Sequence, residues 1–226
     1  DEFAIGTTGF TQVTAAGEGA SFGDTLRIPV QLTATRVTGT GDLAEDVLRN
    51  LDVDGTVTVA DGRVRGDNIR LRTDQIDGLV RLDANLNTRR YDVAAKGTIR
   101  DFQIDGFGQV DLNANVVIRP DAGGFVSVNG RVLADMDRLD IAFLRDLAGG
   151  LPKLDTQIAM GRDKLFTFSD FTLTSPKFRF TGDGVRKADG TFDIRGRGRH
   201  SEYGPLSMKL TGVIDRPVVE LALDRP

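Results

Sequence analysis

The chain of 226 residues contains no cysteine, no tryptophan and a single histidine, His200. The lack of cysteine excludes a disulfide framework and thiolate chemistry. No apolar run approaches the roughly 20 residues that a membrane-spanning helix needs, and no basic-then-apolar leader opens the sequence. The formal net charge of −4 argues against a general preference for nucleic acid. The abrupt start and end suggest an excised fragment whose targeting elements lie elsewhere.

Signals for catalysis are also sparse. His200 has no serine or aspartate at a recognised motif spacing, so we expect it at a turn or on the surface. The DVDG stretch at 52–55 lacks the later ligands of a calcium loop, and no glycine-rich phosphate loop ends in Gly-Lys-Ser/Thr. The sequence therefore predicts no enzyme, no cofactor and no metal site.

What the chain has in abundance is strict alternation of apolar and polar residues. Such a pattern predicts half-buried strands, because successive side chains of a strand point to opposite faces. Turn signals separate the runs, among them Asp-Gly at 61–62, 77–78, 105–106 and 189–190. The pattern predicts a long antiparallel meander of about a dozen strands.

Only two stretches are typical of helix, and both are short. In residues 41–50 Asp42 is the expected N-cap, and Leu43, Val47 and Leu48 share one face. In residues 139–150 Asp140 is the expected N-cap, and Gly149-Gly150 the expected stop.

The two helices also suggest an internal repeat. Each precedes an LD strand, and further on Leu71 corresponds to Leu173 and Ile76 to Phe178. We expect residues 1–24 to be an N-terminal lead-in and residues 25–226 to be one β-groove module, with a possible repeat over about 25–125 and 126–226.

A sheet with one apolar face has to cover that face, and two short helices cannot cover a dozen strands. The sheet is therefore expected to curl on itself, either closed as a sandwich or barrel or left open. We predict an all-β fold: a long curved antiparallel sheet forming an open trough with an apolar inner face and two short helices. An exposed apolar face favours an apolar ligand.

Several phrases carry a family resemblance. Gly182 and Gly184 form a G-x-G step, a D-G-T-F-type turn follows at 189–192, and YGPL opens a strand at 203–206. A closing strand contains Gly212, Pro217, Val219 and Leu221. Over most of its length the chain resembles the AsmA-like and TamB group of bacterial envelope proteins.

The resemblance implies a taco-shaped sheet whose groove conducts phospholipid acyl chains between the inner and outer membranes. It implies a periplasmic location and an inner-membrane anchor outside these residues. It also implies partnership with an outer-membrane barrel of the Omp85 type, with a possible role in outer-membrane protein assembly. The alternatives are a structural or adhesive β-solenoid without lipid, and an enzyme on an all-β scaffold.

The predicted groove residues are the apolar members of the alternating strands. They are Ile28, Val30, Leu32, Val53, Val57, Val59, Leu71, Val80, Leu82, Val93, Leu112, Val116, Val128, Val132, Phe168, Leu173, Phe178, Phe180, Ile194, Leu206, Met208 and Leu210. The phenylalanines of the last third either fill the trough as core or form a wide apolar wall.

RGRGR at 195–199 places Arg195, Arg197 and Arg199 on one face of a strand and two glycines on the other. The arginines are either a solvated outer face or a cationic rim that contacts lipid phosphates. The glycines either mark a bend of the sheet or leave room for an acyl chain.

Overall fold

We describe a computed structural model of the chain, which covers residues 2–5, 8–38, 47–88, 90–104, 106–120, 126–161, 165–213 and 216–224. The elements are β1 (Glu2–Ile5), β2 (Thr8–Thr11), β3 (Thr14–Ala16), β4 (Ala20–Phe22), β5 (Thr25–Thr38), β6 (Arg49–Ala60), β7 (Arg63–Arg72), β8 (Ile76–Asn85), β9 (Arg90–Ile104), β10 (Gly108–Pro120), β11 (Val126–Leu139), α2 (Ala142–Ala148), β12 (Lys153–Met160), β13 (Phe166–Thr174), β14 (Phe178–Arg186), β15 (Phe192–His200), β16 (Gly204–Val213) and β17 (Arg216–Leu223).

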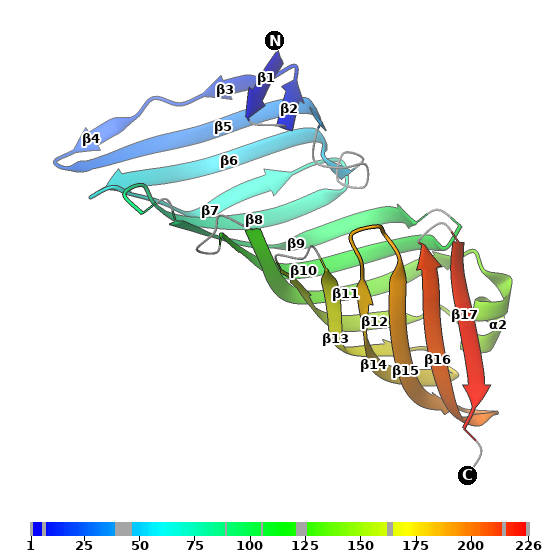
Figure 1. The fold of residues 1–226 in the computed structure, drawn as a ribbon. Coiled ribbons are helices and arrows are strands. Elements are labelled where there is room, and N and C mark those ends of the chain that lie inside the picture. Colours follow the sequence, from blue (N-terminus) through cyan, green and yellow to red (C-terminus); the bar gives the residue numbers. More distant parts are fainter. Residues whose placement is uncertain are drawn as a thin grey trace. The chain divides into compact units, whose positions relative to one another are not determined.

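The predicted all-β class and open antiparallel sheet are confirmed. The strands belong to one sheet that is not closed into a barrel. From β5 to β9 and from β11 to β17, each strand pairs antiparallel with the next (Figure 1). The expected lead-in at 1–24 contains short strands, of which β2, β3 and β4 pair with β5.

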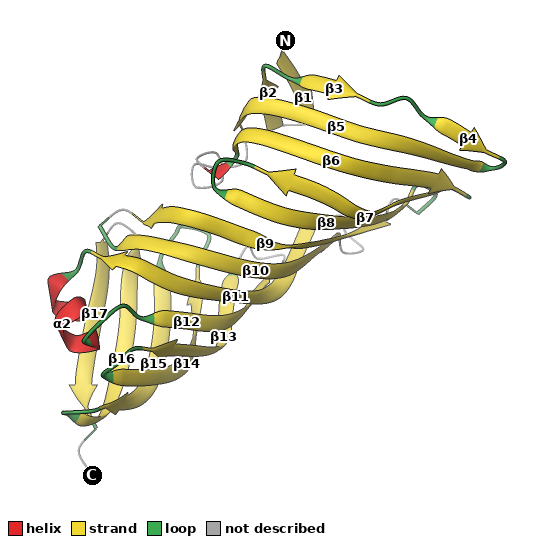
Figure 2. Ribbon diagram, turned by 180° about the vertical axis from the view of Figure 1, so that it is seen from behind, coloured by secondary structure: helices red, strands yellow, loops and turns green. Residues whose placement is uncertain are grey.

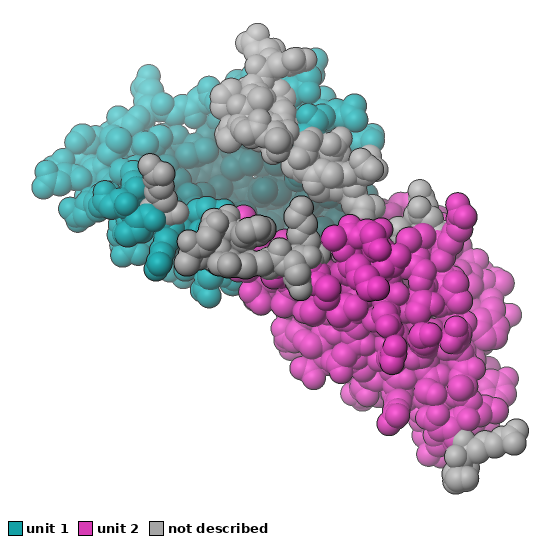
Figure 3. Space-filling view, viewed as in Figure 1, with its two compact units in different colours: residues 1–100, 117–120 teal, residues 101–116, 121–226 magenta. Residues whose placement is uncertain are grey.

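The chain divides into two compact units, which Figure 3 colours separately. Unit 1 comprises residues 1–100 and 117–120, and unit 2 comprises residues 101–116 and 121–226. The single module predicted for 25–226, with its possible repeat, stays a prediction.

In unit 1 the register places the apolar residues on one face. Leu32 lies opposite Val53, which lies opposite Leu71 on the next strand. The adjacent row, which includes Asp52 and Arg72, is exposed on the other face. A slip by one residue would exchange the two rows, so the alternation itself specifies the register.

In unit 2 the sheet curls around its apolar face. Side chains of β13, β14 and β16 pack with Ala148 of α2 in one buried cluster, and Leu154 of β12 and Leu221 of β17 join its margin. Figure 2 shows α2 in red between β11 and β12 in the chain. The predicted short helix therefore covers one part of the face, while the strands cover the rest.

The helix starts differently from the prediction. Ile141 is the N-cap and no side chain caps the helix, so Asp140 as N-cap is wrong. The Asp140 carboxylate instead accepts a hydrogen bond from Arg138 Nε at 2.8 Å. The predicted stop is correct, because Gly149 has the left-handed φ of 64°. Of the first predicted helix, residues 41–46, with Asp42 and Leu43, fall outside the described residues. Val47 is helical and buried, and Arg49 and Asn50 already belong to β6.

Of the predicted Asp-Gly turns, the one at 61–62 is confirmed and the one at 77–78 is wrong. Asp61 and Gly62 both have positive φ, 48° and 68°, as a tight hairpin requires. Asp77-Gly78 as a turn is wrong, because both residues lie inside β8, where Asp77 pairs with Arg72. The actual turn comes just before, where Thr73 N–H donates to the carbonyl of Ile76 at 2.9 Å.

Candidate functional site

The predicted groove residues of unit 1 form a half-buried apolar face. Ile28 and Val57 lie opposite each other on β5 and β6, and Leu82 lies opposite Val93 on β8 and β9. Each predicted groove residue of this unit is intermediate in exposure, that is, neither buried nor fully exposed. These are Ile28, Val30, Leu32, Val53, Val57, Val59, Leu71, Val80, Leu82 and Val93.

One end of this face is closed by the protein itself. Ala34, Val37 and Leu51 are buried together, with Leu32, Val53 and Leu71 packed partly against them. Away from this cluster, around Val57 and Leu82, no described buried cluster covers the apolar side chains. The accessible part of the unit 1 face is therefore its middle and far end.

The predicted groove residues of unit 2 fall into two groups. Leu112, Val116, Val128, Val132, Phe168, Leu173, Ile194, Met208 and Leu210 are intermediate in exposure. Phe178, Phe180 and Leu206 are 8%, 1% and 3% exposed and belong to the core around Ala148. The ring centroids of Phe178 and Phe180 lie 5.0 Å apart, edge to face. These three residues therefore belong to a packed core and do not form an open apolar wall.

The inner glycines of β15 make room for protein rather than for a ligand. A Cβ atom at Gly196 would lie 2.9 Å from the Phe171 ring, and Phe171 is 4% exposed. The ring thus occupies the space that a side chain at position 196 would need.

His200 is where the structure corrects the sequence most clearly. The expected place beside a turn is correct, because His200 ends β15 next to the turn at 201–203, but the expected surface position is wrong, because His200 is 1% exposed. Its Nδ1 accepts hydrogen bonds from the backbone N–H of Glu202 at 3.0 Å and of Tyr203 at 3.4 Å. Nε2 therefore carries the proton and donates to the carbonyl of Leu147 at 3.0 Å. His200 fixes the end of α2 to the β15–β16 turn, which is a structural task.

The arginines of β15 all lie exposed on the outer face, the face opposite Gly196 and Gly198. Arg195 is neutralised by Asp193, whose carboxylate lies 3.0 Å from its Nε. This hydrogen bond lowers the pKa of Asp193. Of the three arginines predicted to contact headgroups, only Arg197 and Arg199 have no ion pair among the described residues.

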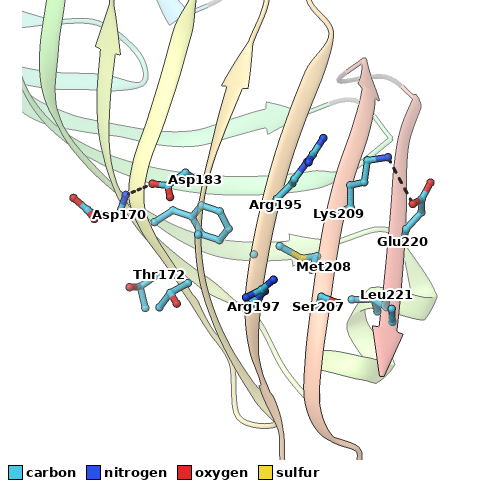
Figure 4. Close-up of a pocket in the computed structure, with 15 residues that line it drawn as sticks. Asp170, Thr172, Asp183, Arg195, Arg197, Ser207, Met208, Lys209, Glu220 and Leu221 are labelled. Carbon is cyan, nitrogen blue, oxygen red and sulfur yellow. Dashed lines mark hydrogen bonds and ion pairs between the residues drawn. The ribbon is translucent and has the colours of Figure 1, made fainter. Parts of the chain in front are cut away.

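A cavity of about 960 Å³ crosses β13–β17. The middle row of its lining includes Phe171, Met208 and Leu221. Polar residues flank this row on β13–β16, and on β17 the flanking residues are Glu220 and Ala222. Figure 4 shows Asp183 accepting a hydrogen bond from the Asp170 backbone N–H, and Lys209 paired with Glu220. Acidic and basic groups balance in the lining, so this cavity does not resemble a site for an apolar tail alone.

The sequence interpretation missed one exposed residue that the register brings to these arginines. Arg179 of β14 lies opposite Arg199, although 20 positions separate them in the chain. Its alternation with Phe178 and Phe180 indicated an outward side chain, but only strand pairing identifies its neighbour.

Among the described residues, no group of three or more histidine, cysteine, aspartate or glutamate side chains could hold a metal ion. Within the same part of the chain, none of the helical structure is long and apolar enough to cross a membrane. Comparison with family models, with curated proteins and with solved structures found no match.

Proposed function

We propose that the apolar face binds phospholipid acyl chains, and that the chain is a periplasmic groove segment for lipid passage between inner and outer membranes. The observation that carries the proposal is the half-exposed apolar face of unit 1, on which no buried cluster of the described residues covers Val57 or Leu82. Apolar surface left open to solvent is costly, by about 25 cal/mol per Å². A ligand with apolar tails would remove that cost.

The chemistry of the face suits sliding as well as retention. Each buried methylene contributes about 0.8 kcal/mol, so a tail held along several side chains would be retained. Valine, leucine and isoleucine at successive positions offer nearly equal environments, so a tail could move between them without a high barrier.

The proposal extends to the cellular setting implied by the family resemblance. A longer protein would carry this segment, with an inner-membrane anchor and an Omp85-type barrel as partner in the outer membrane. Assistance to outer-membrane protein assembly would be a consequence of that partnership.

The test is mass spectrometry of lipid extracted from the purified protein, compared between two variants of one strand. Val57→Asp places an unpaired charge on the apolar face, where burial against tails is strongly unfavourable. Thr56→Asp places the same charge on the exposed outer face and is the matched control. We expect the wild type and Thr56→Asp to retain phospholipid, and Val57→Asp to lose most of it.

Circular dichroism checks that both variants keep their strands. Since the chain has no cysteine, Val57→Cys and Leu206→Cys can also be labelled without background. Added phospholipid should slow the labelling of Val57→Cys. It should not change the labelling of Leu206→Cys, because position 206 is already buried. Absence of lipid from the wild type, or equal lipid in both aspartate variants, would make a structural spacer the better description.

A further inference from the structure

The outer face of unit 2 carries a cluster of three arginines, Arg179, Arg197 and Arg199. Arg179 of β14 lies directly opposite Arg199 of β15. Arg197 lies two residues from Arg199 on the same face, between Thr181 and Ser207. All three arginines are exposed. Directly opposite residues have Cβ atoms about 5 Å apart, and like charges in that position repel.

No acidic group relieves this repulsion among the described residues, because none of the three arginines forms an ion pair. Other strand arginines do, as Arg63 with Asp83 at 3.0 Å and Arg131 with Asp155 show.

Two carboxylates lie near the cluster, and each already accepts a hydrogen bond. Asp183 accepts one from the Asp170 backbone N–H at 3.0 Å. Asp224 accepts one from the Ser207 hydroxyl at 2.9 Å. These neutral donors leave the charge of each carboxylate in place, but among the described residues neither carboxylate forms an ion pair with the three arginines.

The matching strands of unit 1 do not repeat the cluster. Counted from the turn that precedes each strand, Asp77 of β8 occupies the place of Arg179, and its opposite residue is Thr98. Asp77 pairs with Arg70 at 3.5 Å. The unit 1 position thus holds an acid that is neutralised, so the alternating pattern alone does not require arginines at this place.

We propose that Arg179, Arg197 and Arg199 form a binding site for a phosphate group. Guanidinium groups match phosphate oxygens with planar, paired donors, and a doubly charged oxyanion would convert their repulsion into attraction. Arg197 also lines the 960 Å³ cavity together with Thr172 and Thr181, whose hydroxyls can donate to further oxygens. The site lies on the face opposite the proposed acyl-binding face and does not depend on it.

The experiment uses isothermal titration calorimetry with inorganic pyrophosphate at low ionic strength, because salt screens exposed charges. A second arm measures flotation with vesicles of phosphatidylglycerol and of phosphatidylcholine. The test variant is Arg179→Gln/Arg197→Gln/Arg199→Gln. The matched control is Arg27→Gln/Arg90→Gln/Arg100→Gln, which removes the same charge from exposed arginines of unit 1.

We expect the wild type and the control to bind in at least one arm, and the test variant to bind at least about tenfold more weakly there, which is about 1.4 kcal/mol. Binding of pyrophosphate identifies a soluble phosphate compound as ligand, and binding of vesicles alone identifies a lipid headgroup.

Without ligand, the test variant should melt at a higher temperature than the wild type, since repulsion is removed. The control should not show this rise. A wild type that binds in neither arm, or equal loss of binding in the two triple variants, overturns the proposal.

Discussion

Two regions of the chain, β6–β8 in unit 1 and β12–β14 in unit 2, share a turn and differ in what covers their apolar face. In the first, Ile76 N–H donates to the Thr73 hydroxyl at 2.8 Å, and Thr73 N–H donates to the Ile76 carbonyl. In the second, Phe178 N–H donates to the Ser175 hydroxyl at 3.2 Å, and Ser175 N–H donates to the Phe178 carbonyl. The two turns thus share these two hydrogen bonds.

Each turn also forms a hydrogen bond to a buried residue that lies just before the first strand of its region. Val47 precedes β6, and Ala148 precedes β12. The Thr73 hydroxyl donates to the carbonyl of buried Val47 at 2.7 Å. Lys177 N–H donates to the carbonyl of buried Ala148, the last residue of α2, at 3.1 Å. The bulges in β7 and β13 precede Ile69 and Phe171, which are both buried.

The difference lies in side-chain volume after the turn. Ile76 and Gly78 in unit 1 take the places that Phe178 and Phe180 take in unit 2. The two phenylalanines reach Ala148 and Leu206 and fill the space under the helix. With isoleucine and glycine, the equivalent face stays half-exposed. The same alternation therefore gives an open face or a packed one, according to how large the inward side chains are.

The largest expected effect compares one leucine from each unit, Leu82 of β8 and Leu206 of β16. Leu206→Ala, at 3% exposure, should lower the free energy of unfolding by about 3 kcal/mol, because it leaves a cavity. Leu82→Ala removes the same atoms from a half-exposed site and should cost about 1 kcal/mol. Urea unfolding followed by circular dichroism measures both. Equal costs would mean that the two faces are filled alike.

Replacement of His200 tests how the helix of unit 2 is held. His200→Ala leaves the Leu147 carbonyl and the Glu202 N–H without their partner, at an expected cost of about 2 kcal/mol. Tyr203→Ala removes only an exposed ring that stacks on the imidazole at 4.6 Å, and should cost well under about 1 kcal/mol. Hydrogen exchange of α2 amides should accelerate in the first variant alone.

The contribution of the shared turn to stability can be tested in each region separately, by removal of its side-chain hydrogen bond. Thr73→Val loses the bonds to Ile76 N–H and to the Val47 carbonyl, and should cost about 1–2 kcal/mol. Ser175→Ala loses the bond to Phe178 N–H and should cost about 0.5–1 kcal/mol, since the backbone bond from Lys177 remains. A larger loss of thermal stability in Ser175→Ala than in Thr73→Val would contradict this order.

The smallest effect concerns a charge on β11 that has no counterpart in this comparison. Asp137 is exposed, but desolvation of its carboxyl group, and then the negative charges of Asp111 and Asp101, raise its pKa. A carboxyl with a raised pKa destabilises the fold as pH rises through that pKa, because the folded state prefers the protonated form. Asp137→Asn should therefore slightly raise the melting temperature at pH 7 and have no effect at pH 3. A variant that melts lower than the wild type at pH 7 would contradict this.

Local pattern was sufficient for much of the fold. The alternation predicted the strands, and Asp61-Gly62 predicted a hairpin because its positive φ values are intrinsic to those residues. It failed at Asp77-Gly78 and Asp140, where side-chain partners on neighbouring strands or residues compete with turn or cap formation. Asp77 pairs with Arg70 of the neighbouring strand because of the strand register, and Asp140 accepts a hydrogen bond from Arg138 two residues earlier.

The sequence by itself determined which side chains share a face, since the period of two is a property of the extended backbone. Only the tertiary structure decided which parts of that face are covered. In unit 2 the curled sheet and α2 bury Phe180 and His200. In unit 1 the face around Val57 is half-exposed. Strand pairing likewise brought Arg179 beside Arg199. Burial and charge clustering depend on neighbours distant in the chain, and alternation carries no information about which neighbours those are.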